Sequence, residues 1–344
     1  MKLKTIWANE INEGCDISLD RDTVLYIKDN IIQASPPEFK GLPQFFQEQG
    51  MPSSVISELC VDTDASLSPT PIYSVPFRCM EILPINFLAQ QPPENLETDY
   101  CFSFAVKKKT VHRHIFLKLI EYFKFSSYDG TYDGNWRDYD LGRALEEINQ
   151  GNYTPEFLAC ITAPIKLAPR WIESPTDMVK VWESGLDKIC QHSAVHVINE
   201  TISWEKSSQF GEKTLHAIMG MNFPLWVGGY GNARALQRLG FDVFNDVIDH
   251  SYQNLPRLVD RCYQAIALNR RILEDLDYAR WQRQRCATRL RANWYHLFSG
   301  KLENINDEIV QHWPSDVAQL VRPQMINERE RIKQQWQLTG QGCV

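Results

Sequence analysis

The segment that decides the fold runs from Val195 to Phe244 and reads VHVINETISWEKSSQFGEKTLHAIMGMNFPLWVGGYGNARALQRLGFDVF. Short apolar runs of strand length alternate along it with helical patterns. The expected elements, in order, are a strand over Val195–Asn199, a helix over Glu212–Met221, a strand over Pro224–Val227, a helix over Asn232–Leu239 closed by Gly240, and a strand over Phe241–Phe244. This alternation predicts a parallel sheet with right-handed crossovers.

The same alternation begins earlier, at residue 100. Tyr100–Val106 (YCFSFAV) predicts a strand, and the apolar stripe within Val111–Phe125 predicts an amphipathic helix. Tyr128–Asp140 is rich in Gly and Asp and is expected to be a loop. Residues 255–300 are expected to be helical, and a last helix is expected near Ile326–Gln335.

The first hundred residues carry weaker signals. Strands are expected at Thr23–Ile27 and Phe77–Leu83, and short helices at Phe45–Gly50 and Ser53–Leu59. The proline-broken stretch Gln90–Asn95 is the best domain boundary. The predicted regions are an N-terminal domain (1–95), an α/β domain (96–254) and a helical C-terminal extension (255–344).

Composition excludes several classes of protein. The chain has 344 residues, of which 43% are hydrophobic and 23% are charged, so wholesale disorder is excluded. Its 36 basic and 43 acidic residues give a net charge of −7, which disfavours a protein that coats nucleic acid. Residues Arg280–Arg291 are rich in arginine and offer a local nucleic-acid contact, but helical spacing favours a solvated or packed helix.

Cysteines and apolar runs indicate the compartment. The nine cysteines are scattered singly without a CxxC pair, so neither a disulfide framework nor a cysteine zinc site is indicated. The N-terminus lacks the apolar core of a signal peptide, and no stretch approaches the ~20 apolar residues that span a bilayer. The sequence therefore predicts a soluble cytoplasmic protein without a membrane span.

Several residue types in the deciding segment point to a ligand. Glu200 stands at the carboxyl end of a strand, where open parallel sheets bind ligands. The helix that starts at Gly211-Glu212-Lys213 offers unpaired N–H groups and a lysine to an anion, and the Glu212 carboxylate can hold sugar hydroxyls. Gly228-Gly229 lets the backbone approach a ligand closely. A sugar joined to a diphosphate fits these types, although a capped helix and a tight turn explain them equally well.

The order of these motifs resembles the donor-binding half of the α-1,3-fucosyltransferase family. The matching segments are Asn199-Glu200-Thr201, Gly211-Glu212-Lys213 and Pro224–Gly228. The chain is also similar to glycosyltransferase-like proteins encoded by tailed bacteriophages, with which it shares His112-Arg113, Leu239-Gly240-Phe241, Phe244, Asp249–Tyr252 and Asn293. The resemblance covers residues 100–300 and departs from the fucosyltransferases at Val106-Lys107-Lys108-Lys109, where they have Ser-Asn-Cys, and at Gly211, where they have Thr.

This resemblance implies a GT-B-like fold of two Rossmann-like domains facing across a cleft. It implies transfer of a sugar from a nucleotide-sugar to a hydroxyl acceptor, a glycan or a modified nucleic acid, with no metal and no further cofactor. Residues 96–254 would bind the donor and residues 1–95 the acceptor, in the cytoplasm, or the host cytoplasm for a viral protein. The implied donor-binding residues are Arg113 and Lys213 at the diphosphate, with Glu200, Glu212, Gly228 and Gly229.

The sequence does not single out a catalytic base. The acidic candidates of the first domain are Asp62, Asp64, Glu81 and Glu94. His112 and His114 flank Arg113 and are expected to face solvent, whereas His216 lies on an apolar helix and is expected to be packed. Two other functions stay open at this point. One is a non-catalytic binding or structural protein on the same fold, and the other is a glycosyltransferase of hydroxylated nucleic-acid bases.

Overall fold

The computed structural model of the protein describes residues 1–7, 18–28, 52–57, 72–74, 90–106, 109–132, 142–168, 182–200 and 210–339, together with Met80, Pro84 and Phe87. The chain forms two compact units. Unit 1 comprises Met1–Leu88, Trp204–Gly211 and Gly300–Cys343, and unit 2 comprises Ala89–Ser203 and Glu212–Ser299. Each unit contains a parallel β-sheet, which confirms the expected α/β fold class.

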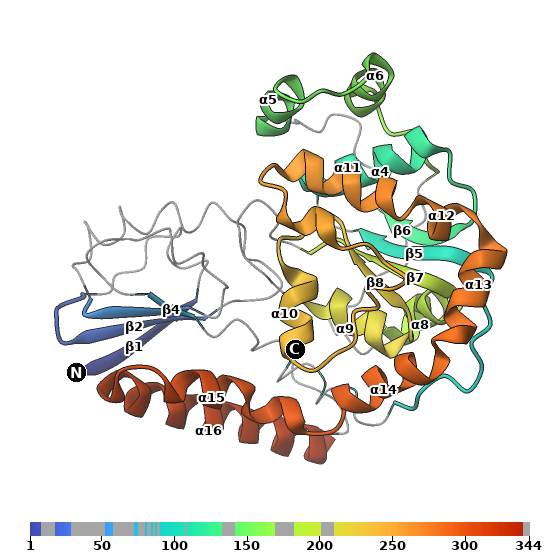
Figure 1. The fold of residues 1–344 in the computed structure, drawn as a ribbon. Helices are drawn as coiled ribbons and strands as arrows, with labels where there is room; N and C mark the ends of the chain where they lie inside the picture. Colours follow the sequence, from blue (N-terminus) through green and yellow to red (C-terminus); the bar gives the residue numbers. More distant parts are fainter. Residues whose placement is uncertain are drawn as a thin grey trace. The chain divides into compact units, whose positions relative to one another are not determined.

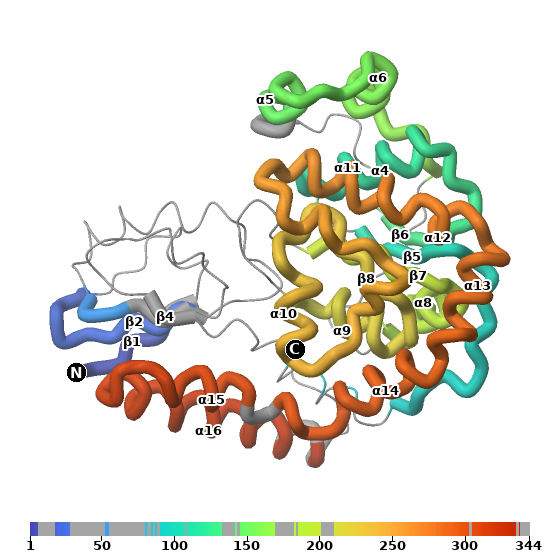
Figure 2. Tube along the Cα trace, in the orientation of Figure 1, coloured from blue at the N-terminus to red at the C-terminus, as the bar shows by residue number. Residues whose placement is uncertain are grey.

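Unit 1 is built on a sheet whose described strands follow the order β1-β2-β3-β4, all parallel. They are β1 (Lys2–Trp7), β2 (Thr23–Lys28), β3 (Ser54–Ser57) and β4 (Ile72–Ser74). The helical elements are η4 (Lys301–Asn304), α15 (Ile305–Gln311) and α16 (Ser315–Thr339). Figure 2 shows the last helices of the chain beside its first strands, and Val24 and Tyr26 of β2 share a buried core with Val310, Val321 and Met325.

One expected helix of unit 1 is a strand. The sequence predicts a short helix at Ser53–Leu59, whereas the structure has β3 there, paired with β2. Val55 and Ile56 are both β-branched, which favours a strand over a helix. The predicted strand at Thr23–Ile27 is confirmed as β2. The predictions at Phe45–Gly50 and, apart from Met80, at Phe77–Leu83 lie outside the described residues.

Unit 2 is built on a parallel sheet whose described strands follow the order β6-β5-β7-β8. They are β5 (Tyr100–Val106), β6 (Tyr128–Tyr132), β7 (Ser193–Ile198) and β8 (Phe223–Trp226). Every residue of β7 and β8 is buried. Such continuous burial is typical of parallel strands that are covered on both faces, which explains their apolar runs.

Helices cover both faces of this sheet, as Figure 1 shows, with α4 and α11 on one side and α8 and α9 on the other. The helical elements are α4 (Val111–Phe123), α5 (Arg143–Asn149), α6 (Pro155–Thr162), η2 (Trp182–Leu186), α8 (Asp187–Gln191), α9 (Glu212–Met219), α10 (Asn232–Arg238), η3 (Ser251–Asn254), α11 (Leu258–Leu268), α12 (Arg270–Glu274), α13 (Leu276–Arg285) and α14 (Ala287–Leu297). The expected starts of α4, α9 and α10 are confirmed.

One expected loop of unit 2 is a strand. Tyr128–Tyr132, the first part of the predicted loop, pairs with β5 as the edge strand β6. Gly130 suggested a turn, but a Cβ at this position would collide with the ring of Phe104. The glycine therefore makes room for an aromatic side chain of the neighbouring strand.

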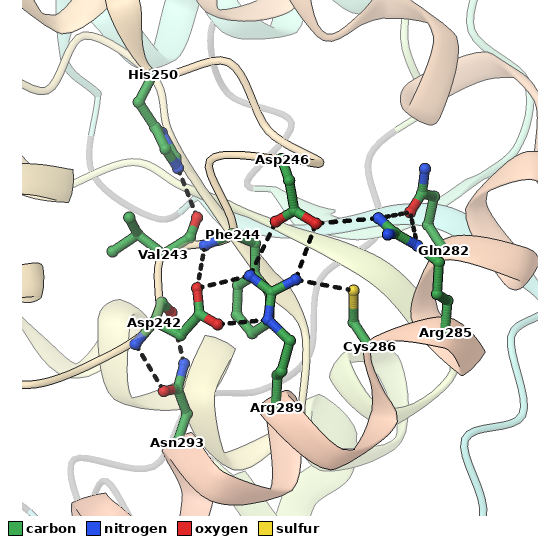
Figure 3. A network of polar contacts seen from close by, with 10 residues as sticks. All are labelled: Asp242, Val243, Phe244, Asp246, His250, Gln282, Arg285, Cys286, Arg289 and Asn293. Atoms are coloured by element: carbon green, nitrogen blue, oxygen red, sulfur yellow. Dashed lines mark hydrogen bonds and ion pairs between the residues drawn. The ribbon is translucent and has the colours of Figure 1, made fainter.

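One expected strand is irregular backbone. Phe241–Phe244 forms no strand, because side chains satisfy its main chain. Asp242 N donates to Asn293 Oδ1 over 2.9 Å, Asn293 Nδ2 donates to Asp242 O over 2.6 Å, and Phe244 N donates to Asp242 Oδ1 over 2.8 Å. Phe244 has a left-handed φ of 58°, which ends any extended run. Figure 3 shows this arrangement.

The helices after residue 255 divide between the units. The predicted helical character of 255–300 is confirmed in α11 to α14, but these helices belong to unit 2 and not to a separate extension. The expected last helix, Ile326–Gln335, is the middle of the longer α16 in unit 1. Within the described ranges, no helix is both long and apolar enough to cross a membrane.

Candidate functional site

The order of the strands in unit 2 creates a point where the chain reverses direction across the sheet. From β5 the chain passes through α4 to β6 on one side, and from β7 it passes through α9 to β8 on the other. The connections after β5 and β7 therefore diverge. Open parallel sheets bind ligands at such a point, at the carboxyl ends of the strands. The first turns of α4 and α9 both follow strands that end at this edge.

Glu200 lies at this edge, just after β7, and its side chain is anchored. The residue is 6% exposed, and Thr214 Oγ1 donates to Glu200 Oε1 over 2.8 Å. Trp226 Nε1 in turn donates to Thr214 Oγ1 over 3.2 Å. A polar chain thus links β8, α9 and the carboxylate, and it fixes Glu200 where the sequence placed a donor-binding acid.

Arg113 lies in the first turn of α4 and is buried, with 2% exposure. Its Nη2 and Nε donate to Asn199 O over 2.8 and 3.3 Å, so the guanidinium fastens the end of β7. Burial lowers the pKa of the guanidinium, and the charges of Glu212 and Glu200 oppose that shift. The side chain that the sequence assigned to a diphosphate therefore has a structural partner as well.

Glu212 and Lys213 open α9 and form an ion pair with each other. The Lys213 side chain is only 12% exposed, so this lysine of the first helical turn is largely covered by its surroundings. Burial opposes ionisation of the Glu212 carboxyl, but the charge and hydrogen bond of Lys213 lower its pKa to about 2. The Glu212 carboxylate therefore stays ionised beside Lys213 at neutral pH.

His112 stands among these charges, and the structure corrects the expectation that it faces solvent. It is 1% exposed, and its Nε2 donates to Glu200 O over 2.7 Å. Burial, then the charge of Arg113, lowers the pKa of His112 well below its usual range, and Lys213 and Arg261 act in the same direction. The imidazole is therefore neutral at pH 7. His114 is buried too, whereas the expected packing of His216 is confirmed by its stacking on Trp182.

Arg261, in α11, also belongs to this edge, although no sequence motif singles it out. Its Nε donates to Gly228 O over 3.0 Å, and its Nη1 donates to Leu255 O and Pro256 O over 2.9 and 3.0 Å. The guanidinium also lies 5.6 Å from the centroid of the Tyr230 ring. Arg261 holds the loop after β8 as Arg113 holds the end of β7. Leu255 and Pro256 precede Arg261 by only six and five residues, but Gly228, the partner that ties it to the loop after β8, lies 33 residues away.

Gly228 and Gly229 are required by packing. Gly228 has a φ of +77°, and a Cβ on it would lie 2.9 Å from Leu258 Cδ1. A Cβ on Gly229 would lie 2.6 Å from Asn232 Oδ1 and 2.9 Å from Trp226 Cβ. The tight turn that the sequence left open as an alternative is therefore real. A ligand that approaches this loop would use the same small residues.

No protein-family model matches the chain. No curated protein and no solved structure matches it either. The resemblance to the fucosyltransferases therefore stays a prediction. What indicates a ligand site in this chain is the geometry at the carboxyl edge of the unit 2 sheet, together with the charges gathered there.

A cavity of about 470 Å³ begins in the loop after β8, at Gly231, and extends along α10. Its lining includes Arg234, Gln237, Asn245, Asp249 and Asn254, so it is rich in groups that bond hydroxyls and amides. Arg234 Nη2 already donates to Asn254 Oδ1 over 3.1 Å. The cavity thus adjoins the glycine loop and has the polarity of a site for a polar ligand.

Most of the acidic candidates for a catalytic base, and most of the lysines at 107–109, lie outside the described residues. Of the acidic candidates for a catalytic base, Asp62, Asp64 and Glu81 lie outside the described residues, and Glu94 is exposed in unit 2. Of the three consecutive lysines at which the chain departs from the fucosyltransferases, Lys107 and Lys108 lie outside the described residues, and Lys109 is exposed. In the ranges that the structure covers, no cluster of three or more His, Cys, Asp or Glu side chains is arranged to hold a metal ion.

The arginine-rich run of α13 and α14 is bound to the fold, which favours the packed-helix interpretation. Arg289 pairs with Asp242 and Asp246, and Arg285 pairs with Asp246, as Figure 3 shows. Arg283 is fully buried. Its donors reach the carbonyls of Glu97, Gln191, Gly220 and Met221 over 2.7 to 3.2 Å. These side chains are engaged within unit 2 and do not form a free basic face.

Proposed function

We propose that unit 2 binds a nucleotide-sugar at the carboxyl edge of its sheet and that the protein is a metal-independent glycosyltransferase of the cytoplasm. One observation carries the proposal. The first turns of α4 and α9 flank the reversal point of the strand order, and Arg113, Lys213 and Arg261 gather there around a neutral imidazole. Backbone N–H groups at helix starts and fixed cations together favour a phosphorylated anion.

The charges match the chemistry of the transfer. A departing nucleoside diphosphate must be stabilised as the bond from the sugar to the phosphate oxygen breaks, and preorganised cations do this without a metal. Among the described residues of this edge, Arg113, Lys213 and Arg261 are positive, and Glu200 and Glu212 are negative. The surplus of positive charge, with about half a charge from a helix start, favours the diphosphate. The carboxylates have the acceptor oxygens that sugar hydroxyls need.

We assign the nucleoside to the cavity along α10. Its volume of about 470 Å³ lies within the ~300–1,000 Å³ that is usual for small-molecule sites. Asp249 in its lining can accept from the two hydroxyls of a ribose, and the amides of Gln237 and Asn245 can pair with a base. Gly231 connects this lining to the glycine loop at the proposed diphosphate site.

The test is calorimetric titration with UDP, GDP and the two unphosphorylated nucleosides. Lys213→Ala should weaken the binding of the preferred diphosphate about ten- to a hundredfold, because a charge-assisted hydrogen bond is lost. Lys188→Ala is the matched control, because Lys188 is exposed on α8, which precedes β7 and lies at the opposite edge. Equal affinity of wild type and Lys213→Ala, or equal binding of nucleoside and diphosphate, contradicts the proposal.

Transfer itself is tested separately, with radiolabelled UDP- and GDP-sugars and a panel of glycans and hydroxylated DNA. Incorporation of label that persists in EDTA is the expected result. Loss of incorporation in EDTA, with recovery on addition of manganese or magnesium, contradicts the metal-independent mechanism.

A second candidate is a nucleotide-sugar-binding protein without catalysis, and one observation favours it. The titratable groups described at this edge are already engaged: Glu212 with Lys213, Glu200 with Thr214, and His112 with a carbonyl. A general base needs a proton-accepting group that can reach the acceptor hydroxyl. Tight diphosphate binding without label transfer, and without hydrolysis of any donor, identifies this second function.

A further inference from the structure

A second, smaller cavity of unit 2 is lined by four aromatic side chains and five polar ones. It has a volume of about 250 Å³ and lies between the end of α4, the start of α6 and the first half of α11. Tyr122, Tyr153, Phe157 and Tyr263 line it. The Phe157 ring lies 5.0 Å from that of Tyr263 at 80°, 5.4 Å from that of Tyr122 at 85° and 4.9 Å from that of Tyr153 at 34°. The rings of Tyr122 and Tyr263 therefore stand nearly at right angles to that of Phe157, whereas the ring of Tyr153 is tilted against it.

The rest of the lining is polar and electrically balanced. Arg257 Nε donates to Asp260 Oδ2 over 2.6 Å, and the Tyr153 hydroxyl donates to Asp260 Oδ1. Burial, then the hydrogen bond and charge of Asp260, raises the pKa of the Tyr153 hydroxyl, so this group stays protonated. The amides of Asn152 and Gln264 complete the polar side. Because Arg257 and Asp260 neutralise each other, the cavity favours a neutral ligand over a phosphate or an ammonium group.

Both ends of the cavity are built on capped helices, so its shape is defined. Thr154 Oγ1 accepts from Phe157 N over 3.2 Å at the start of α6. Glu147 Oε2 accepts from Val259 N over 3.1 Å at the start of α11. Side-chain caps of this kind hold the first turn of a helix in place. The lining residues Phe157, Asp260 and Tyr263 are therefore held on fixed elements.

We propose that this cavity is a binding site for a neutral pyranose, a single sugar ring. The C–H groups on one face of a pyranose carry a small positive charge and pack on the negative face of an aromatic ring. Two neighbouring hydroxyls of the sugar can each donate and accept a hydrogen bond. Side chains that end in two polar atoms can bond both hydroxyls at once, and the cavity offers four of them: Asp260, Arg257, Asn152 and Gln264. A whole nucleotide-sugar is too large for the cavity and carries charge that the Arg257–Asp260 pair does not attract.

This site is independent of the proposed diphosphate site, although one helix serves both. The start of α11 presents Arg257 and Asp260 to the aromatic cavity. From the same turn, Leu258 packs beside Gly228, and Arg261 donates to the carbonyl of Gly228. The two sites therefore use different residues of the same turn. A failure of one assignment leaves the other testable.

The test is saturation-transfer NMR and titration of the full chain with methyl pyranosides of glucose, galactose, mannose and fucose, with uridine and adenosine as competitors. At least one pyranoside should receive saturation. Tyr263→Leu should weaken the binding of that pyranoside about tenfold, because an aromatic face is lost. Gln264→Ala should weaken the same binding severalfold. Tyr295→Leu is the matched control, because Tyr295 is 56% exposed on α14 and outside the cavity. Lys213→Ala should leave pyranoside binding unchanged.

Three results overturn the proposal. One is the absence of saturation transfer to every pyranoside at millimolar concentration. Another is pyranoside binding that Gln264→Ala and Asn152→Ala leave at the wild-type value; these polar variants decide the question if Tyr263→Leu fails to fold. The third is binding of uridine or adenosine, and of no pyranoside, in a manner sensitive to Gln264→Ala, which would mark a site for planar bases.

Discussion

Buried arginines hold both edges of the unit 2 sheet, but the two edges differ in what surrounds them. At the amino edge, Arg283 donates to carbonyls of the segments that lead into β5, β7 and β8. At the carboxyl edge, Arg113 and Arg261 donate to carbonyls of the segments that leave β7 and β8. Burial lowers the pKa of all three guanidinium groups, that of Arg283 to about 9.

The two edges share one feature and differ in others. A guanidinium bound to carbonyls occurs at both edges, so it is a structural device and does not by itself indicate a ligand. The carboxyl edge adds Glu200, Glu212, Lys213 and His112, and it adds the first turns of two helices. These additional groups therefore distinguish the candidate site, and substitution of Lys213 tests it more directly than substitution of Arg113.

The largest expected effect is a loss of stability at the amino edge that leaves diphosphate affinity unchanged. Arg283→Met should lower the free energy of unfolding by about 3–5 kcal/mol, because several buried carbonyls lose their donor. Urea titration followed by circular dichroism measures it, with Arg270→Met, at an exposed pair, as control. Diphosphate affinity of the folded fraction should be unchanged. If it falls as far as in Lys213→Ala, the two edges are not functionally distinct.

The pH dependence of stability gives the next largest effect. His216 is buried, neither ring nitrogen has a hydrogen-bond partner among the described residues, and burial lowers its pKa to about 4. The unfolded chain takes up this proton near pH 6.5 and the folded chain does not, so stability is full above that pH and falls toward pH 4. His216 alone should contribute on the order of 2–3 kcal/mol to this fall.

Urea titrations between pH 4 and 7.5 measure this slope. His216→Gln should flatten it, whereas His192→Gln should not, because His192 lies at the amino edge, where it is exposed and bonds to Asp99. His196, whose pKa burial lowers to about 3, keeps part of the slope in the variant. If His216→Gln leaves the slope unchanged, His216 does not contribute to the pH dependence of stability.

Glycine substitutions compare the two edges directly. Gly228→Ala should cost about 1–3 kcal/mol, because φ is +77° and the new Cβ meets Leu258. The new Cβ should also displace the first turn of α11 and with it Arg261, and the affinity for the diphosphate should therefore fall severalfold. Gly220→Ala is the counterpart at the amino edge, where the new Cβ would lie 2.7 Å from Cys190 Cβ. It should destabilise the fold without changing affinity, and equal affinity losses in both variants would contradict the assignment.

The smallest expected effect is at the ion pairs of Figure 3. Arg289 is 39% exposed, so Arg289→Ala should lower stability by only about 1 kcal/mol despite its contacts with Asp242 and Asp246. Calorimetric melting at low and high salt should show the difference from wild type shrinking with salt. Diphosphate binding should not change. A loss of binding here would extend the functional region into a part of the fold that we regard as structural.

The sequence predicts the core of unit 2 well, because its signals are local. The apolar runs of β5, β7 and β8 and the stripes of α4, α9 and α10 each lie within one short segment. Gly240, predicted to end α10, has the left-handed φ of +89° that such a glycine supplies.

The rest could not be predicted, because it depends on partners far along the chain. β6 contains Asp and Gly and looks like a turn until β5 pairs with it. Phe241–Phe244 looks like a strand until Asn293, 51 residues away, takes its hydrogen bonds. At the candidate site, Glu200 and Lys213 stand in local motifs, whereas the role of Arg261 depends on a carbonyl 33 residues away.

The position of Arg283 in the chain also sets when unit 2 can be completed during synthesis. Its acceptors Met221, Gln191 and Glu97 are made 62, 92 and 186 residues earlier. At ~5–20 residues per second, the segment before β5 waits roughly 10–40 s for its donor. During that time β5, β7 and β8 are synthesised one after another without the side chain that joins their starts. We therefore expect unit 2 to complete its fold late, and a nascent chain stalled before residue 283 to expose its apolar strands to chaperones and proteases.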